Sequence, residues 1–253
     1  ALTQSLLQEV PSVYNTQITE ALLTAFAQTL TQWTEQPTTL INLESYGRFS
    51  EKLDLSRTVG WFTALYPALL TFDTTDSLSN NFKSIKSQLR AVPNQGISYG
   101  LLRYLRNTAE DSLSEKLETS PDVSFNYLGQ LDTIEKGVVE ENAFQRVTTT
   151  TPNQATANGR PHLLDVNSWI ENHQLQVEWT FSSHHHTPDT IHQLSEQFLS
   201  NLTALIEHCC EKEEAEYTPD DFGLVQLDAS ALAAVLGQVS FTDTSTVERE
   251  VSR

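Results

Sequence analysis

Residues 162–210 read HLLDVNSWIENHQLQVEWTFSSHHHTPDTIHQLSEQFLSNLTALIEHCC. Apolar and polar side chains alternate over 162–170 and again over 175–181, which predicts two β-strands joined by a short turn. Thr187 is a good N-cap residue, and after it apolar side chains recur at three- and four-residue steps over 188–210. The stretch therefore predicts a β-hairpin followed by a long amphipathic helix.

The chain before this hairpin is also a mixture of strands and helices. Helical periodicity covers 16–34 and 76–91, a third helix is expected over 99–106, and strand-forming residues fill 39–43 and 122–128. Because strands and helices are interleaved along the chain, we expect an α/β fold with one mixed β-sheet flanked by helices.

Other segments are less regular. The apolar stretch 58–72 is interrupted by Pro67 and fits a helix or a strand. The polar segment 132–160 is expected to be a long loop, and a short apolar helix over 229–236 is expected before a polar tail.

Composition excludes several classes of protein. The 253 residues include 15 basic and 33 acidic side chains, a formal charge of −18, which argues against a nucleic-acid partner. No apolar run approaches the roughly 20 residues of a membrane span, and no basic segment precedes an apolar one at the start, so neither a membrane helix nor a signal peptide is expected. The two cysteines, Cys209 and Cys210, are adjacent and form a poor structural disulfide, which favours a reducing, cytoplasmic location.

Five short sequences are too specific to be generic. They read EALLTA at 20–25, NLESYGR at 42–48, LSRTVGWFTALYP at 55–67, PNQGISYG at 93–100 and SFNYLGQ at 124–130. In this order they resemble core motifs of the epimerization domains of nonribosomal peptide synthetases, which are relatives of condensation domains. The resemblance runs from about Val10 to Leu227, so we expect one domain over 1–227 and a short helix with a tail or linker over 228–253.

The resemblance implies a chloramphenicol-acetyltransferase-like lobe. Domains of this family have two such lobes with the active site in a tunnel between them, and the motifs quoted above belong to the C-terminal lobe. The histidine motif HHxxxDG belongs to the N-terminal lobe of the same domain, which is missing here and which we expect as the partner of this lobe. The family also implies a peptidyl carrier protein and neighbouring synthetase modules as partners. The substrate would arrive on the phosphopantetheine arm of the carrier, with no cofactor bound directly.

Glu44 is the first candidate catalytic residue. In the family, the glutamate of this motif faces the catalytic histidine across the tunnel, and two acid/base groups on opposite sides of Cα can remove and return a proton. Ser45, Tyr46 and Phe49 stand where the family motif has glycine, histidine and glutamate. The alternative is an ordinary surface ion pair between Glu44 and Arg48.

Asn126 and Tyr127 are the next candidates, because the family places this pair near the tunnel. An amide or a phenol there could orient the thioester or donate a hydrogen bond to the enolate. Alternatively, Tyr127 packs in the core and Asn126 pairs with a loop. Trp61, Phe62 and Tyr66 are expected to be core aromatics.

The run His184-His185-His186 followed by Asp189 imitates the family's histidine motif. Thr190 replaces the glycine, and the run lies after the last core motif, so we reject it as the active site. Neighbouring side chains of an extended segment point to opposite faces, so we expect no metal site there.

A cluster of basic residues stands out against the acidic chain. Five cations and no acid lie between positions 83 and 106, which could form a dock for the phosphopantetheine phosphate and its acidic carrier protein. The alternative is the solvated face of two helices. The candidate binding residues are Lys83, Lys86, Arg90 and Arg103.

Together these features predict a lobe of an epimerase that converts an L-aminoacyl or peptidyl thioester to the D form. Two alternatives are a lobe of a peptide-bond-forming condensation domain and an inactive lobe that only docks carrier proteins. A single lobe should expose the apolar wall that it shares with its partner, so we expect self-association or a bound partner.

Overall fold

The structure is a computed structural model that describes residues 2–48, 54–105, 117–118, 120–131, 159–212, 214–222 and 228–236. Residues 1–215 form one compact unit and residues 216–253 a second one. Most of the expected loop over 132–160 and the expected polar tail after residue 236 lie outside the described residues.

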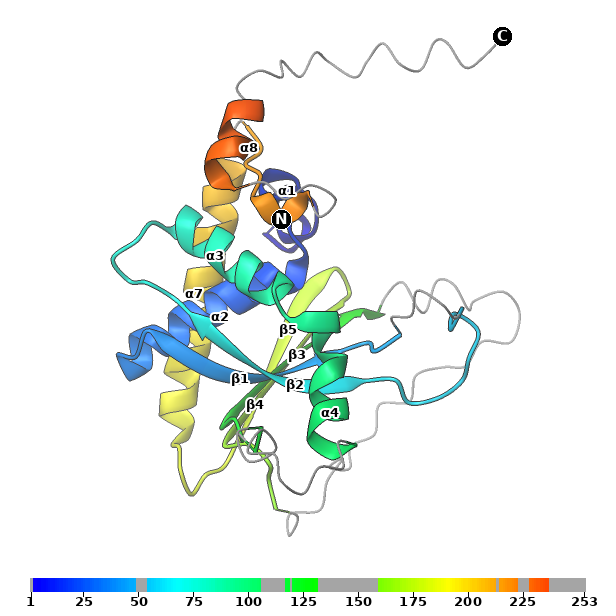
Figure 1. Cartoon of the computed structure of the whole chain (residues 1–253). Coiled ribbons are helices and arrows are strands. Elements are labelled where there is room, and N and C mark those ends of the chain that lie inside the picture. Colours follow the sequence, from blue (N-terminus) through cyan, green and yellow to red (C-terminus); the bar gives the residue numbers. More distant parts are fainter. Residues whose placement is uncertain are drawn as a thin grey trace, which may run out of the picture. The chain divides into compact units, whose positions relative to one another are not determined.

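One mixed, five-stranded sheet organises the first unit (Figure 1). Its strands are β1 (Thr38–Ser45), β2 (Ala64–Thr71), β3 (Val123–Gln130), β4 (Leu164–Glu171) and β5 (Gln174–Phe181), in the order β2-β1-β3-β4-β5. The two outer pairs are antiparallel, and β1, β3 and β4 run parallel to one another. The predicted mixed sheet flanked by helices is therefore confirmed.

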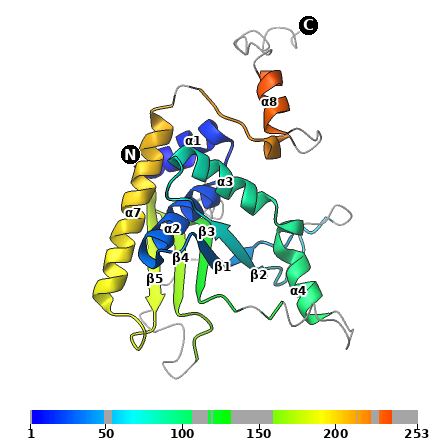
Figure 2. The same cartoon turned by 60° about the vertical axis from the view of Figure 1, so that its left-hand side comes forward.

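Helices cover one face of this sheet (Figure 2). They are α1 (Leu2–Tyr14), α2 (Ile18–Thr34), α3 (Leu78–Arg90) and α7 (Pro188–Cys210). Their buried side chains pack on alternate strand residues such as Ile41, Leu43, Phe125 and Val166, because side chains two residues apart on a strand point to the same face. No helix in the described part of the chain is both long and apolar enough to cross a membrane.

The stretch 162–210 folds as its pattern predicts. Asn172 and His173 both have positive φ, 53° and 59°, as the two central residues of a tight type I′ hairpin turn require. Thr187 Oγ1 accepts a hydrogen bond from the Thr190 amide, which caps α7.

Two elements contain a proline that obscures their pattern. Helix α1, which the sequence pattern did not predict, contains Pro11, and its burial against α7 and α2 stabilises it. Pro67 lies in β2, which is an edge strand, where a missing amide N–H is tolerated because one side of the strand has no partner. The ambiguous stretch 58–72 is therefore a strand only from Ala64 onward.

The expected core position of Trp61 is wrong. Its side chain is 90% exposed, because residues 61–63 precede β2 and belong to no strand or helix that could pack them on the core. Tyr66, by contrast, packs against the core from within β2, and Phe62 is only half-buried.

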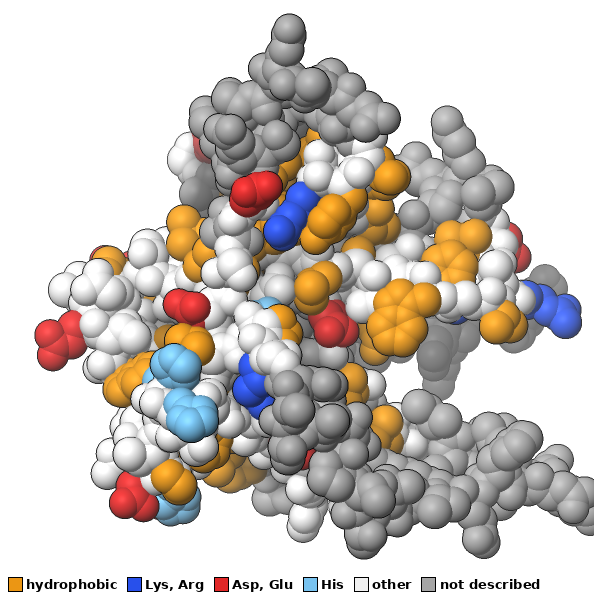
Figure 3. Space-filling view, turned by 90° about the horizontal axis from the view of Figure 1, so that it is seen from below, with side chains coloured by type: hydrophobic (Ala, Val, Ile, Leu, Met, Phe, Trp, Pro, Cys, Tyr) orange, Lys and Arg blue, Asp and Glu red, His pale blue; other side chains and the backbone are white. Residues whose placement is uncertain are grey.

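The other face of the sheet carries the exposed side chains. Strand residues on this face include Glu44, Leu65, Leu69 and Leu128, all of which are exposed. The short helix α4 (Ile97–Tyr104), which follows the 3-10 turn η1 (Pro93–Gly96), lies beside β2 (Figure 1). In the space-filling view of Figure 3, apolar side chains stand at the surface among polar ones.

The second unit contains the 3-10 turn η2 (Pro219–Asp221) and the helix α8 (Ala229–Leu236). Helix α8 has the bounds that the apolar pattern predicts.

Candidate active site

Two of the predicted catalytic residues meet on the exposed face of the sheet. Strands β1 and β3 pair in parallel with Asn42 opposite Ser124, so Glu44 and Asn126 fall side by side two residues further on. Asn126 Nδ2 donates a hydrogen bond to Glu44 Oε2 at 3.1 Å. The structure therefore brings these two candidates into direct contact at the end of β1.

The environment of Glu44 raises the pKa of its carboxyl group. Its carboxyl group is partly withdrawn from water, which raises its pKa above the usual range, and a positive charge on His162 opposes this effect. Arg48 does not pair with Glu44 in the described structure. Its guanidinium donates to the carbonyls of Leu55 and Thr58, at 2.8 and 2.9 Å. The alternative of a Glu44–Arg48 surface ion pair is therefore wrong.

Tyr127 lies on the other face of β3 from its neighbour Asn126. It packs against the core, and burial together with the nearby Tyr46 hydroxyl raises the pKa of Tyr127 to about 12. Its phenol is therefore neutral at physiological pH. The structure does not bring it into contact with Glu44.

A polar network on the same sheet face was not predicted. His162 Nδ1 lies 2.8 Å from Asp165 Oδ1, and His162 Nε2 lies 3.0 Å from Asn42 Nδ2. Asp165 also accepts hydrogen bonds from Ser124 Oγ, at 2.6 Å, and from the Arg160 guanidinium. These residues lie on β1, β3 and β4 and in the segment that precedes β4. They are far apart in the sequence, so only the order of the strands brings them together.

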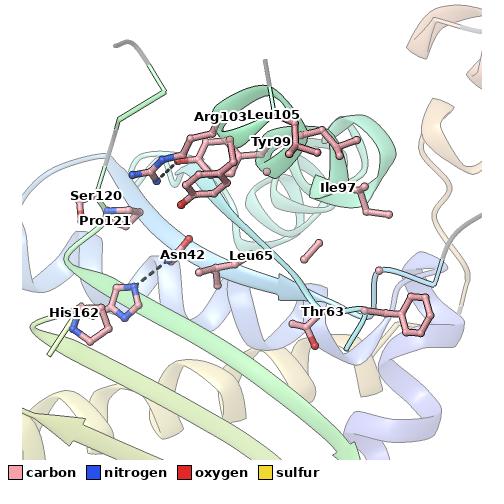
Figure 4. A pocket seen from close by; sticks show the side chains of 17 residues that line it. Asn42, Thr63, Leu65, Ile97, Tyr99, Arg103, Leu105, Ser120, Pro121 and His162 are labelled. Carbon is pink, nitrogen blue, oxygen red and sulfur yellow. Dashed lines mark hydrogen bonds between the residues drawn. The ribbon is translucent and has the colours of Figure 1, made fainter. Parts of the chain in front are cut away.

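A cavity of about 680 Å³ separates this face from α4 (Figure 4). His162 and Asn42 line one side, Leu65 lies on β2, and Tyr99 and Arg103 project from α4. Glu44 does not itself line the cavity, but its cross-strand partner Leu65 and its neighbour on the same sheet face, Asn42, do. Its lining is mostly apolar, and its volume is in the range of small-molecule sites.

The start of α4 is fixed by a glycine. Gly96 has φ +87°, and a Cβ at this position would lie 2.0 Å from Tyr66 Cδ1. Only glycine allows both the left-handed backbone and the close approach of η1 to β2.

The expected basic dock is only partly present. Lys86 is fully buried and donates from Nζ to the Tyr14 carbonyl at 2.6 Å, so its assignment to an exposed phosphate site is wrong. Arg90 forms an ion pair with Glu20, at 2.9 Å, and donates to the Asn15 carbonyl. These two cations instead join α3 to the end of α1 and the start of α2.

The other two basic candidates are more accessible. Lys83 is partly exposed on α3, and Arg103 donates to the Tyr99 hydroxyl at 2.9 Å while it lines the cavity. Arg106, counted in the same basic cluster, lies outside the described residues.

The histidine run lies at the surface, and histidines are also visible in Figure 3. His184 and His185 are exposed, and the His186 ring meets Trp33 edge to face at 5.6 Å. Within the described ranges, no three His, Cys, Asp or Glu side chains are arranged as metal ligands.

Comparison with known proteins finds long relatives in peptide synthetases. The chain is 39% identical over 245 residues to a linear gramicidin synthase polypeptide from Brevibacillus parabrevis, and 36% identical over 239 residues to gramicidin S synthase 1 from Brevibacillus brevis. These matches cover 93% and 89% of the chain but only 3% and 21% of the two relatives. The chain therefore corresponds to a small part of each synthetase.

Comparison with solved structures gives the same fold. The epimerization domain from the third module of tyrocidine synthetase B has a TM-score of 0.74 and 31% identity. The match covers 84% of this chain and 47% of that domain. A condensation domain that mediates chain release in the enacyloxin polyketide synthase is less similar, with a TM-score of 0.53 and 12% identity.

The family model described as "Condensation domain" matches residues 1–227, which is most of the chain. The protein therefore belongs to the condensation domain family.

Proposed function

We propose that the chain is the C-terminal lobe of an epimerization domain of a nonribosomal peptide synthetase. The whole domain would convert an L-aminoacyl or peptidyl thioester on a carrier protein to the D form. The contact between the Glu44 carboxylate and the Asn126 amide, on the same sheet face as the cavity, carries this proposal. The epimerization domain of tyrocidine synthetase B supports it, because it is more similar to this chain than the condensation domain of the enacyloxin synthase.

The reaction needs one group to remove the α-proton and another to return a proton from the opposite side. Glu44 would act as one of these groups, and a histidine of the N-terminal lobe would act as the other. Asn126 would hold the carboxylate in position through its hydrogen bond to Oε2. The thioester carbonyl takes up negative charge as the proton leaves, and a positioned donor would stabilise this charge.

The exposed apolar side chains fit a lobe that shares its tunnel with a partner. Leu69, Leu105 and Tyr104 are 61%, 72% and 72% exposed, and Leu65 is 47% exposed at the cavity. Exposed apolar groups that cluster beside a site mark a surface that another body covers. The N-terminal lobe is the proposed cover. Carrier-protein docking would then use the accessible cations Lys83 and Arg103.

The test is deuterium exchange at the substrate α-carbon. The complete domain, containing this chain, is incubated in D2O with an aminoacyl-loaded carrier protein. We expect exchange and D product, and a loss of about 10²–10⁴-fold in Glu44→Gln, as for removal of a general base. Glu178→Gln is the matched control, because Glu178 is an exposed carboxylate on the same sheet face at β5.

The alternatives give different results in the same experiment. Peptide-bond formation without exchange would indicate a condensation domain. If neither exchange nor peptide-bond formation occurs but the carrier protein still binds, the chain is a docking lobe. Exchange that is equally fast in Glu44→Gln would remove Glu44 from the mechanism.

A further inference from the structure

A hydrogen-bonded chain on the exposed sheet face ends at Asn42, two residues before Glu44 on β1. It runs from Asp165 through the imidazole of His162 to the amide of Asn42, with heavy-atom distances of 2.8 and 3.0 Å. Figure 4 shows the last of these contacts at the wall of the cavity. His162 is nearly buried, with only 11% of its side chain exposed, so the imidazole is held in one place.

The partners of the imidazole define its protons. A carboxylate can only accept hydrogen bonds, so the Nδ1–H of His162 donates to Asp165 and Nε2 faces Asn42. In the neutral state, Nε2 accepts from the Asn42 amide group. In the protonated state, Nε2–H can donate to the amide oxygen of Asn42 after the amide turns over. Asn42 can therefore accommodate both charge states of the imidazole.

Asn42 also connects the imidazole to Glu44 in space. The two residues are two positions apart on β1 and point to the same face, so their Cα atoms are about 7 Å apart at roughly 3.3 Å per residue. Because His162 Nε2 lies 3.0 Å from the amide of Asn42, a positive charge on His162 stands close enough to act on the Glu44 carboxylate. This charge opposes the effect of partial burial, which raises the pKa of Glu44. An imidazole changes its charge between about pH 5 and 8, where a working carboxylate base must stay ionised.

Other titratable and charged groups also lie near Glu44 and His162, and their partners bear on the charge at this site. On the described elements around Glu44 and His162, the titratable and charged side chains include Tyr46, Arg48, Tyr66, Tyr99, Arg103, Tyr104, Tyr127, Arg160 and Asp165.

Among these groups, Arg160 binds Asp165 and offsets its charge. Arg48 and Arg103 donate to carbonyls and to a tyrosine hydroxyl, respectively. The phenols of Tyr66 and Tyr127 have raised pKa values and are neutral. A positive charge on His162 would therefore stand against Asn42, on the sheet face that carries Glu44.

We propose that His162, held by Asp165, is a positioning residue that keeps Glu44 ionised at the acidic end of the working pH range. The proposal rests on the proposed function of Glu44 as an acid/base group. His162 acts through its charge and through Asn42, and it need not touch the reacting atoms.

The direct test follows the Glu44 carboxyl carbon by ¹³C NMR through a pH titration of the 253-residue chain. In His162→Gln the titration midpoint should move to higher pH, because the opposing positive charge is lost. In His162→Lys the charge is retained, and the midpoint should stay at or below that of the wild type. His192→Gln is the matched control, because His192 is an exposed imidazole on α7 and should leave the midpoint unchanged.

The same variants in the complete domain give a kinetic readout. In His162→Gln, the ratio of the α-carbon exchange rate at pH 5 to that at pH 8 should fall about threefold relative to His192→Gln. An unchanged carboxyl titration in His162→Gln would overturn the proposal, as would equal shifts in His162→Gln and His162→Lys. A wild-type domain without exchange would contradict the proposed function, while the carboxyl titration would still decide the role of His162.

Discussion

Replacement of Gly96 by alanine is expected to lower the free energy of unfolding by about 2–5 kcal/mol. Gly96 has φ +87°, where an L-residue costs roughly 1–2 kcal/mol. The added Cβ would also lie 2.0 Å from Tyr66 Cδ1, so the ring or the backbone must move. Overpacking of this kind costs about 1–3 kcal/mol, and this cost adds to that of the backbone strain to give the expected loss.

A second glycine nearby provides the matched control. Gly100 lies inside α4, and a Cβ there would have no atom within 4 Å. Gly100→Ala should therefore leave stability unchanged or raise it by about 0.5–1 kcal/mol, because alanine favours the helix. The double variant Gly96→Ala with Tyr66→Ala removes the collision and keeps the backbone strain. The loss of stability caused by Gly96→Ala is then the difference between the double variant and Tyr66→Ala alone. This loss should be only about 1–2 kcal/mol.

Urea unfolding of the chain, followed by circular dichroism, measures these differences. The same variants in the complete domain test the site, because Gly96 sets where α4 stands across the cavity from Leu65. Gly96→Ala should raise KM for the loaded carrier protein more than it lowers kcat. The reasoning is refuted if Gly96→Ala is as stable as the wild type, or if Gly100→Ala is destabilised equally.

Three further predictions concern the core, Glu44 and the exposed face. Phe26→Ala should destabilise the chain by about 3–5 kcal/mol in urea unfolding, because Phe26 is fully buried. Trp61→Ala should change stability by less than about 0.5 kcal/mol, because the Trp61 side chain is 90% exposed. Because burial raises the pKa of Glu44, ionisation weakens the fold as pH rises, so Glu44→Gln should raise the melting temperature relative to the wild type at pH 7 and not at pH 4. The isolated chain should self-associate in sedimentation velocity, and Leu69→Lys should reduce this association more than Leu199→Lys at the similarly exposed α7 position.

The sequence could predict the elements whose pattern is local. The hairpin over 162–181 and helix α7 follow from alternation, helical periodicity and one cap residue, and all three are local signals. Helix α1 contains Pro11, and its stability comes from burial of Leu6 and Val10 against other helices. Such packing is invisible to periodicity alone.

The residues of the candidate site also fall into those that a local motif reveals and those that only the tertiary structure brings together. Glu44 and Asn126 could be identified from motifs, because each motif is a short continuous segment. His162 lies 120 residues after Asn42, and no spacing rule connects them. Only the strand order β1-β3-β4 places the segment before β4 within reach of β1. Charge counts along the sequence failed for a similar reason, because Glu20, which pairs with Arg90, lies 70 residues away.

The side chains that differ from the expected epimerization motif after Glu44 lie at a turn whose backbone is fixed by a glycine. Gly47 has φ +60°, and a Cβ there would lie 1.6 Å from the Phe62 carbonyl oxygen, so this position requires glycine. Ser45 still pairs with Ala64 as the last residue of β1, and Tyr46 is 69% exposed beyond it. The direction of Glu44 is therefore set by the pairing of β1 with its neighbours and by the hydrogen bond from Asn126. Restoring glycine and histidine at positions 45 and 46 should accordingly leave the contact between Glu44 and Asn126 intact, and any change in exchange rate would come from the new imidazole.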